Sequence, residues 1–233
     1  TIADKEYIVE ETTENSFDGM DIVLGAAEND IAEKYLPIAA EKGAVVVDNS
    51  SAFRLDEQVP LIIPEVNPQA VREHHGIIAN PNCATIIALV ALQPLHAYAN
   101  AKRMVVSTYQ AVSGAGVNGI RELNQQVGAL AHGKEIAVNT FQYQIAYNLI
   151  PQIGGFNEAG YSSEEMKMQN EGRKIMSNPE LCVNCTCVRV PVIRSHSESI
   201  MVEFEKEISV EKARELLQGA PGVRLVDAPL KLV

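Results

Sequence analysis

The chain has 233 residues, with 30 acidic and 19 basic side chains and a formal net charge of −11. Its length suits one large domain or two small ones. Hydrophobic residues make up 46% and charged residues 21% of the chain, a composition that excludes disordered and fibrous proteins. So acidic a surface repels phosphate backbones and anionic membranes, and no apolar run approaches the roughly 20 residues of a membrane span. We therefore expect neither a nucleic-acid nor a membrane partner.

The first predicted elements form a strand–helix–strand unit. Residues 22–27 are a short apolar run, and a helix capped by Asn29 or Asp30 is expected to stop at Gly43. Residues 44–48 are apolar and β-branched up to Asp48, as in a buried parallel strand. The polar residues from Asp48 to Ser51 follow at the carboxyl end of that strand, where open α/β sheets bind ligands.

The elements after residue 76 indicate a second kind of domain. A short strand at 76–79 leads into Asn80-Pro81-Asn82-Cys83 and an apolar helix over 84–98. A strand at 103–109 and helices at 117–125, 162–176 and 209–218 follow. Strands at 186–193 and 199–205 alternate in polarity and predict an antiparallel sheet joined by residues 194–198. The fold class is therefore α/β, with a nucleotide-type domain over 1–82 and an α+β domain over 83–233.

Cys83 is the strongest single candidate for chemistry. A thiol at a helix start is expected to meet unpaired amide N–H groups and the positive end of the helix dipole, which lower its pKa. On position alone, an inert buried cysteine remains the alternative. A nucleophilic cysteine needs a proton-transfer partner, and of the five histidines His196 lies in a polar cluster between two strands. That cluster is either a surface turn or the rim of a site.

The remaining cysteines, Cys182, Cys185 and Cys187, lie within six residues on a strand-like stretch. This spacing is not the spread pattern of a secreted disulfide framework, so it indicates a reducing, cytoplasmic location. Since no second cysteine pair and no adjacent histidine is present, buried strand thiols are favoured over a metal site, and no metal is expected.

Several motifs occur together in an order and spacing that resemble one known family. They are Asp48–Arg54, Pro60–Asn67, Asn80–Thr85, Ser107–Gly116, Glu164–Met168 and Arg189–Ser199. Each is weak alone, but in register they are specific and span nearly the whole chain. The family they resemble is bacterial aspartate-β-semialdehyde dehydrogenase.

The resemblance implies the NADPH-dependent reductive dephosphorylation of L-aspartyl-4-phosphate to L-aspartate 4-semialdehyde. This oxidoreductase reaction releases phosphate and serves lysine, diaminopimelate, threonine and methionine biosynthesis. By the resemblance, Cys83 attacks the acyl phosphate and forms an acyl-thioester intermediate, which is then reduced. His196 matches the family's acid/base histidine, and Gln110 matches the glutamine that orients the intermediate.

Substrate and cofactor contacts are implied in the same way. Arg189 would bind the α-carboxylate and Glu164 the ammonium group of the substrate; burial in an apolar strand also makes an anionic partner of Arg189 expected. The phosphate would contact Arg54, Lys167 and Asn82, although Arg54 and Lys167 could equally be solvated surface charges. The implied NADP contacts are Ser113, Gly114 and Asn49.

The resemblance also implies a partial Rossmann-like domain and a second domain like that of glyceraldehyde-3-phosphate dehydrogenase. Through that second domain the family forms homodimers or homotetramers, and residues 186–205 are our candidate interface. No Gly-x-x-Gly-x-x-Gly loop precedes Ile22, so we expect a chain truncated at both ends with weak or no NADP binding of its own. Two alternatives stay open, an N-acetyl-γ-glutamyl-phosphate reductase and a non-catalytic interaction module.

Overall fold

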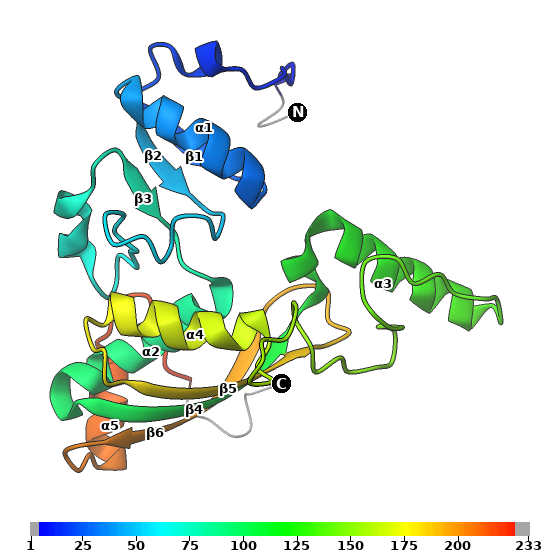
Figure 1. Ribbon diagram of the computed structural model, residues 1–233. Coiled ribbons are helices and arrows are strands. Elements are labelled where there is room, and N and C mark those ends of the chain that lie inside the picture. Colours follow the sequence, from blue (N-terminus) through cyan, green and yellow to red (C-terminus); the bar gives the residue numbers. More distant parts are fainter. Residues whose placement is uncertain (1–4, 227–233) are drawn as a thin grey trace. The chain divides into compact units, whose positions relative to one another are not determined.

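The computed structural model describes residues 5–226 of the chain. Its contacts divide them into two compact units (Figure 1). The first contains the residues up to Ile62 together with Pro68–Pro81, and the second contains Ile63–Asn67 and the residues from Asn82 onward.

The first unit is built on a three-stranded parallel sheet in the order β1-β2-β3. Helix α1 connects the first two strands and packs beside them, so the predicted strand–helix–strand unit is confirmed. Short 3-10 helices η1 and η2 complete this unit. The bounds are η1 Glu14–Phe17, β1 Ile22–Gly25, α1 Asn29–Glu41, β2 Val45–Asp48, η2 Pro68–Glu73 and β3 Ile77–Ala79.

The start of α1 differs from the prediction. Glu28 occupies the N-cap position and its side chain makes no capping hydrogen bond. The side chain of Asn29 instead bonds the loop after β2, accepting from the amide of Ser51 at 3.0 Å and donating to its hydroxyl at 2.9 Å. The predicted stop at Gly43 agrees with a φ of +95°, a conformation that glycine adopts without steric cost.

The second unit contains a three-stranded sheet in the order β5-β4-β6. Strand β4 (Ala101–Gln110) pairs in parallel with β5 (Cys182–Arg189) and antiparallel with β6 (Ser197–Phe204). The predicted direct pairing of the strands at 186–193 and 199–205 is therefore wrong, because β4 lies between them. The segment that joins them is bonded to the residues after β4 instead: the amides of Val112 and Ser113 donate to the carbonyls of Val192 and Ile193.

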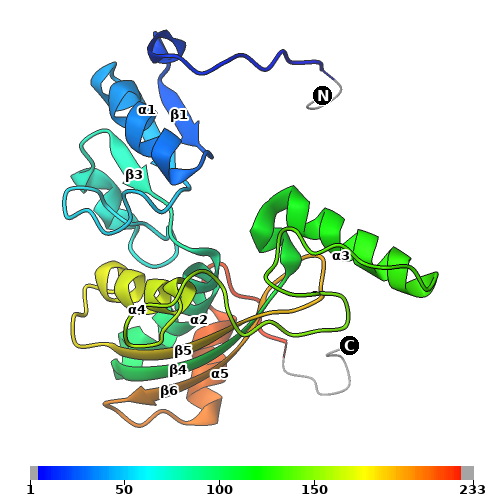
Figure 2. The ribbon, with the colours of Figure 1, turned by 45° about the vertical axis from the view of Figure 1, so that its right-hand side comes forward.

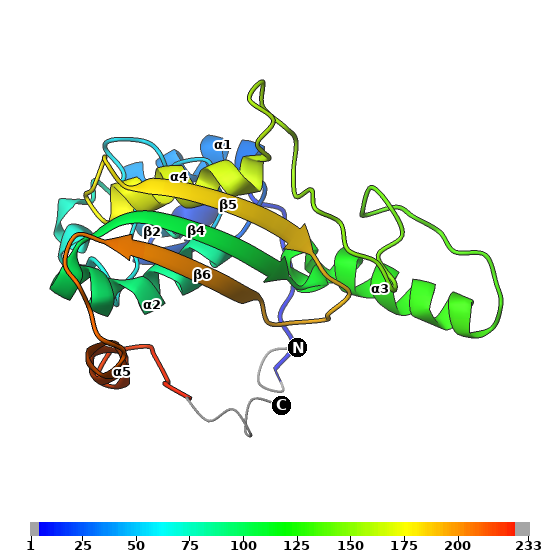
Figure 3. The ribbon, with the colours of Figure 1, turned by 90° about the horizontal axis from the view of Figure 1, so that it is seen from below.

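Two helices, α2 (Cys83–Ala99) and α4 (Ser163–Ile175), contact this sheet, and α5 (Val210–Gln218) contacts α2. From Arg103 onward β4 alternates, so Met104 and Val106 are buried while Val105 and Tyr109 are exposed, as is Met201 of β6. Figure 3 looks onto the exposed face, which in the described part of the chain carries no helix.

The chain after β4 forms a small subsidiary core. Helix η3 (Val112–Ala115) leads into α3 (Gly116–Ala131), which extends away from the sheet in Figure 2. Gln126 of α3 is 1% exposed, and its Oε1 accepts the amides of Ile145 and Ala146 at 2.9 and 3.1 Å. The apolar part of this core consists of Val112, Leu123, Ile145, Ala146 and Ile150.

The described residues also bear on the predictions about membrane spans, cysteines and metal sites. Within residues 5–226 no helix is both long and apolar enough to cross a membrane. Cys185 and Cys187 are buried on β5 as predicted, with their sulfurs 3.5 Å apart, whereas Cys182 at the strand start is exposed, contrary to the prediction. In this part of the chain no three His, Cys, Asp or Glu side chains are grouped to hold a metal ion.

Candidate active site

The start of α2 is built by Asn82, which places Cys83 at the first helical position. The side-chain oxygen of Asn82 accepts the amides of Ala84 and Thr85 at 2.9 and 3.3 Å. Asn82 has the extended backbone of an N-cap (φ −61°, ψ 144°), and asparagine is among the preferred residues there. The Pro81-Asn82 turn therefore fixes Cys83 as the first residue of helix α2.

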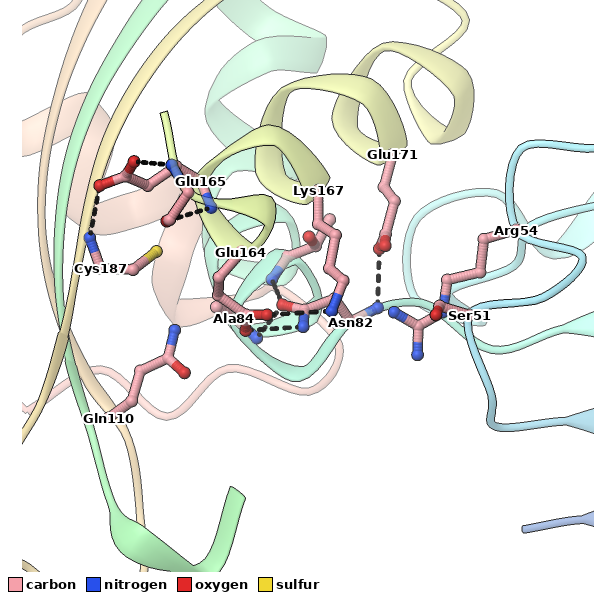
Figure 4. A network of polar contacts seen from close by, with 12 residues as sticks. Ser51, Arg54, Asn82, Ala84, Gln110, Glu164, Glu165, Lys167, Glu171 and Cys187 are labelled. Carbon is pink, nitrogen blue, oxygen red and sulfur yellow. Dashed lines mark hydrogen bonds and ion pairs between the residues drawn. The ribbon is translucent and has the colours of Figure 1, made fainter. Parts of the chain in front are cut away.

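Helix α4 holds this turn from the other side. Asn82 Nδ2 donates to Glu164 at 2.8 Å, and its backbone amide donates to Glu171 at 2.7 Å (Figure 4). A capping box between Ser162 and Glu165 starts α4 and directs Glu164 inward from the first turn. Lys167, one turn on, pairs with Glu164 at 3.1 Å.

Glu164 is ionised although it is only 7% exposed. Burial raises the pKa of its carboxyl, but Lys167, Asn82 and the charge of Arg189 outweigh burial and hold the pKa below its ordinary value. The site thus contains a buried negative charge with one partner, Lys167, on the next turn of α4 and two others, Asn82 and Arg189, on other elements.

The thiol of Cys83 does not have the lowered pKa that its position predicts. It reaches solvent, but the protein atoms packed on its other side raise its pKa, and so does the charge of Glu164. The Ala84 amide and Arg189 lower the pKa without offsetting these effects. The amides of Ala84 and Thr85 in the first turn already donate to Asn82, so the helix start lowers the thiol's pKa less than its position predicts.

Gln110 and Arg189 are register partners at the ends of β4 and β5. Gln110 is 1% exposed, and its amide nitrogen donates to Thr108 Oγ1 at 3.3 Å. Arg189 is 7% exposed, and its Nη1 donates to the carbonyl of Ala111 at 2.8 Å. Burial lowers the pKa of the guanidinium, whereas Glu164 and Cys83 raise it, so an anionic environment partly offsets the cost of burying this cation.

His196 is held by the backbone of the same residue as Arg189, Ala111. Its Nδ1 accepts the amide of Ala111 at 3.0 Å, so in the neutral ring the proton is on Nε2. Burial lowers the pKa of His196, Arg189 lowers it further, and Glu164 opposes both. Ser195, directly before it, has a φ of +73°, a left-handed conformation in which non-glycine residues concentrate at functional sites.

The second unit therefore brings four predicted residues into one electrostatic neighbourhood. Glu164 and Arg189 act on the titration of both Cys83 and His196. Gly114 lies beside His196, because a Cβ built on it would be 3.5 Å from the ring atoms Cε1 and Nε2. Ser113, next to it, is half-buried in η3.

The predicted residues of the first unit form a network of their own at the carboxyl ends of β2 and β3. Arg54 Nε and Nη2 donate to the carbonyls of Asn80 and Asn49 at 2.9 and 3.1 Å. The side chains of Asn49 and Asn80 bond each other at 2.8 Å. Arg54 is 7% exposed, so the alternative of a solvated surface charge is wrong for it.

Sequence reasoning missed two groups in this site. Glu171 is 1% exposed and binds the Asn82 amide; its signal was a spacing of seven residues from Glu164, two turns along one helix face. Ala111 contributes only its backbone, whose carbonyl bonds Arg189 and whose amide bonds His196. A backbone group leaves no signal in residue type, so only the structure reveals it.

Together the two units define a class of protein. A parallel α/β unit with polar groups at the carboxyl ends of its strands precedes a mixed-sheet unit with a thiol, an imidazole and a buried carboxylate paired with a lysine, as in two-domain oxidoreductases with a dinucleotide-binding domain. Family models agree with this division: residues 2–74 match the semialdehyde dehydrogenase NAD-binding domain, and residues 92–232 match the semialdehyde dehydrogenase dimerisation domain. The chain belongs to the aspartate-semialdehyde dehydrogenase family, as its motifs predicted.

Individual relatives show how close this membership is. The aspartate-semialdehyde dehydrogenase of Aquifex aeolicus is 52% identical over 233 residues, which cover 98% of this chain and 68% of that protein. The crystal structure of aspartate semialdehyde dehydrogenase II from Vibrio cholerae, complexed with ASA, is 46% identical with a TM-score of 0.89 and covers 90% of this chain and 63% of that one. The Candida albicans enzyme with NADP is 25% identical, with a TM-score of 0.63 over 85% of this chain and 55% of that one. The chain thus spans about two thirds of the first two relatives.

Proposed function

We propose that this chain carries out the reductive dephosphorylation of L-aspartyl-4-phosphate to L-aspartate 4-semialdehyde through a thioester on Cys83. The observation that carries the proposal is the shared electrostatic environment of Cys83 and His196, set by Glu164 and Arg189. The family membership and the ASA complex of the Vibrio cholerae relative support the same substrate. The reaction would place the chain in the biosynthesis of lysine, threonine and methionine.

Recognition of the amino-acid part of the substrate follows from the buried charges. Arg189 has one guanidinium hydrogen bond within the described chain, to a carbonyl, and binds the α-carboxylate with its remaining donors. Glu164 binds the ammonium group. Because the charge of Glu164 raises the pKa of Cys83, a bound ammonium beside it favours the thiolate, so substrate binding itself activates the nucleophile.

The acyl-transfer step uses the thiolate and the leaving phosphate. The sulfur of Cys83 attacks the acyl carbon, the C–S bond forms and phosphate leaves with the electron pair of the C–O bond. Lys167, Asn82 and Arg54 are the proposed phosphate contacts. Both polar atoms of the Asn82 side chain already have protein partners, so Lys167 is the better placed of the two contacts in the second unit.

His196 and Gln110 act on the carbonyl oxygen and its intermediates. With Nδ1 occupied by the Ala111 amide, neutral His196 presents Nε2–H and serves as a hydrogen-bond and proton donor. Gln110 is buried and held by Thr108, which suits it to orient the acyl group through its amide.

NADP is the proposed cofactor, supported by the NAD-binding family model and by the NADP complex of the Candida albicans relative. The first unit fits a dinucleotide, because the Asn49–Asn80 amide network lies at the carboxyl ends of two parallel strands. Asn49 and Ser113 would contact it. When bound, the reduced cofactor supplies the hydride that reduces the thioester.

We also propose a homodimer, or a homotetramer built from it, through the exposed face of the β5-β4-β6 sheet. The dimerisation-domain model covers residues 92–232, which include all three strands. Val105, Tyr109 and Met201 are 36%, 46% and 55% exposed on that face, and a second copy would bury them.

The test of the activity is phosphate-dependent reduction of NADP with L-aspartate 4-semialdehyde, measured for the wild type, Cys83→Ser and Cys182→Ser. Cys182 is an exposed thiol on β5 and provides the matched control. We expect turnover by the wild type and Cys182→Ser and loss of at least about a thousandfold in Cys83→Ser.

A cofactor-independent readout isolates the acyl-transfer step. Incubation with aspartyl phosphate without NADPH should leave an acyl adduct on the peptide that contains Cys83, detected by mass spectrometry. Turnover retained by Cys83→Ser, or faster turnover of N-acetylglutamate semialdehyde than of aspartate semialdehyde, would overturn the proposal.

A further inference from the structure

The backbone of one residue, Ala111, joins the predicted acid to the predicted carboxylate-binding cation. Ala111 donates its N–H to His196 Nδ1 at 3.0 Å and accepts from Arg189 Nη1 at 2.8 Å through its carbonyl. The next two amides, of Val112 and Ser113, bond the carbonyls of Val192 and Ile193. Three consecutive amides therefore anchor the His196 loop.

Gly114 is hydrogen-bonded to the same Ala111 carbonyl. Its amide donates to Ala111 O at 3.2 Å, the oxygen that also accepts Arg189. A Cβ built on Gly114 would be 2.7 Å from Arg189 Nη1, closer than real Cβ atoms come to any heavy atom. Gly114 is not among the glycines with positive φ, so its backbone conformation does not require glycine. The close approach of the Arg189 guanidinium does require it.

We propose that Gly114 is a positioning residue for substrate recognition. Because it has no side chain, the Arg189 guanidinium can occupy the position from which it binds the substrate carboxylate. The inference rests on the proposed function and changes the role that the sequence predicts for Gly114, which is cofactor contact. A methyl group at 114 would force Nη1 from 2.7 Å to an ordinary contact of at least 3.4 Å. Nη1 is pinned by Ala111 and the side chain is 7% exposed, so it has little freedom to move without losing that bond.

The first experiment compares Gly114→Ala with the wild type and with Gly128→Ala. Gly128 lies in α3, and a Cβ there meets nothing within 4 Å, so it controls for the substitution itself. We expect Gly114→Ala to raise the KM for aspartate semialdehyde about tenfold, as for a weakened charge-assisted hydrogen bond, and to leave the KM for NADP within about twofold. A raised KM for NADP with an unchanged KM for the aldehyde would overturn the proposal in favour of cofactor contact.

A double-mutant cycle tests whether Gly114 acts through Arg189. Lysine lacks the forked guanidinium group that lies beside Gly114. In an Arg189→Lys background, Gly114→Ala should therefore raise the KM for the aldehyde little further. Equal fold-losses in both backgrounds would show independent roles and contradict the proposal.

A third measurement does not depend on turnover and separates this proposal from the activity itself. The charge of Arg189 lowers the pKa of His196, and burial and Glu164 are the other contributions to it. Displacing Arg189 in Gly114→Ala should therefore raise the His196 pKa in an NMR titration, while Gly128→Ala leaves it unchanged. If the wild type proves inactive on aspartate semialdehyde, the proposed function fails, and this titration still decides whether Gly114 positions Arg189.

Discussion

At the scale of single residues, Glu164 influences three other titratable groups of the site. Its charge raises the pKa of Cys83, of Arg189 and of His196. It stays ionised at 7% exposure because Lys167 and Asn82 outweigh the effect of burial. Removing one of those partners should therefore be visible in the pH dependence of stability.

Lys167→Met tests this dependence. The folded-state pKa of Glu164 is lowered, so its contribution to stability is present above the unfolded pKa and is lost as pH falls through the folded value. The variant should lose about 1–2 kcal/mol of unfolding free energy at pH 7, less than for a fully buried pair because the Lys167 side chain is 34% exposed. Urea titrations should show the difference narrowing as the pH falls below the ordinary pKa of a glutamate, because protonated Glu164 needs no cation.

Lys212→Met is the matched control for that experiment. Lys212 forms an ion pair of the same spacing with Glu215 at 2.8 Å, but Glu215 is 69% exposed. Its removal should leave the stability almost unchanged at every pH. Equal losses in the two variants would mean that the Glu164 pair is an ordinary surface pair.

The tautomer of His196 gives a second prediction at this scale. Because its Nδ1 accepts an amide proton, nitrogen NMR at pH 7 should show an unprotonated Nδ1 and a protonated Nε2. His132 should show the opposite tautomer in the same spectrum, since its Nδ1 lies 2.8 Å from the Gly128 carbonyl, which can only accept. A protonated Nδ1 in His196 would remove its proposed role as an Nε2 donor.

The residue types of the site were readable from the sequence, but their states were not. Cys83 at a helix start and Arg189 in an apolar strand were both found in advance. The raised pKa of Cys83 was not, because it depends on burial of the thiol in the folded chain and on the charge of Glu164, which is 81 positions away in sequence. Such distant contacts decide a pKa, and a local pattern does not contain them.

At the scale of elements, the helices were predicted closely while the strand order was not. Alternation predicted strands at 186–193 and 199–205, whereas β5 begins and ends four residues earlier, and alternation does not say which strand lies beside which. The short predicted connection at 194–198 suggested a hairpin. The observed connection crosses the end of β4 instead, because the amides after β4 supply its hydrogen bonds.

Helix α3 and the segment after it give the prediction at this scale. Gln126→Leu keeps the volume of the side chain but leaves the buried amides of Ile145 and Ala146 without an acceptor, at a cost of about 1–3 kcal/mol. Hydrogen exchange at those two amides should speed up markedly. Gln125→Leu changes the exposed neighbour and should leave their exchange unchanged; equal acceleration would indicate general destabilisation of α3.

At the scale of the whole molecule, self-association is the property that the exposed sheet face predicts. Met201→Lys places a charge where a second copy would bury apolar surface, and it should raise the dimer dissociation constant by about tenfold or more. Sedimentation equilibrium measures this. Val210→Lys, on an exposed position of α5, should leave association unchanged; a wild type that sediments as a monomer would refute the interface.

The two contacts that fix Asn82 also order events during synthesis. Glu164 and Glu171, which hold the turn before Cys83, lie 82 and 89 residues later in the chain. On the ribosome, the thiol emerges long before these carboxylates are made. The cysteine is therefore an ordinary side chain on a nascent polypeptide and acquires its chemical character only when α4 has left the exit tunnel and docked.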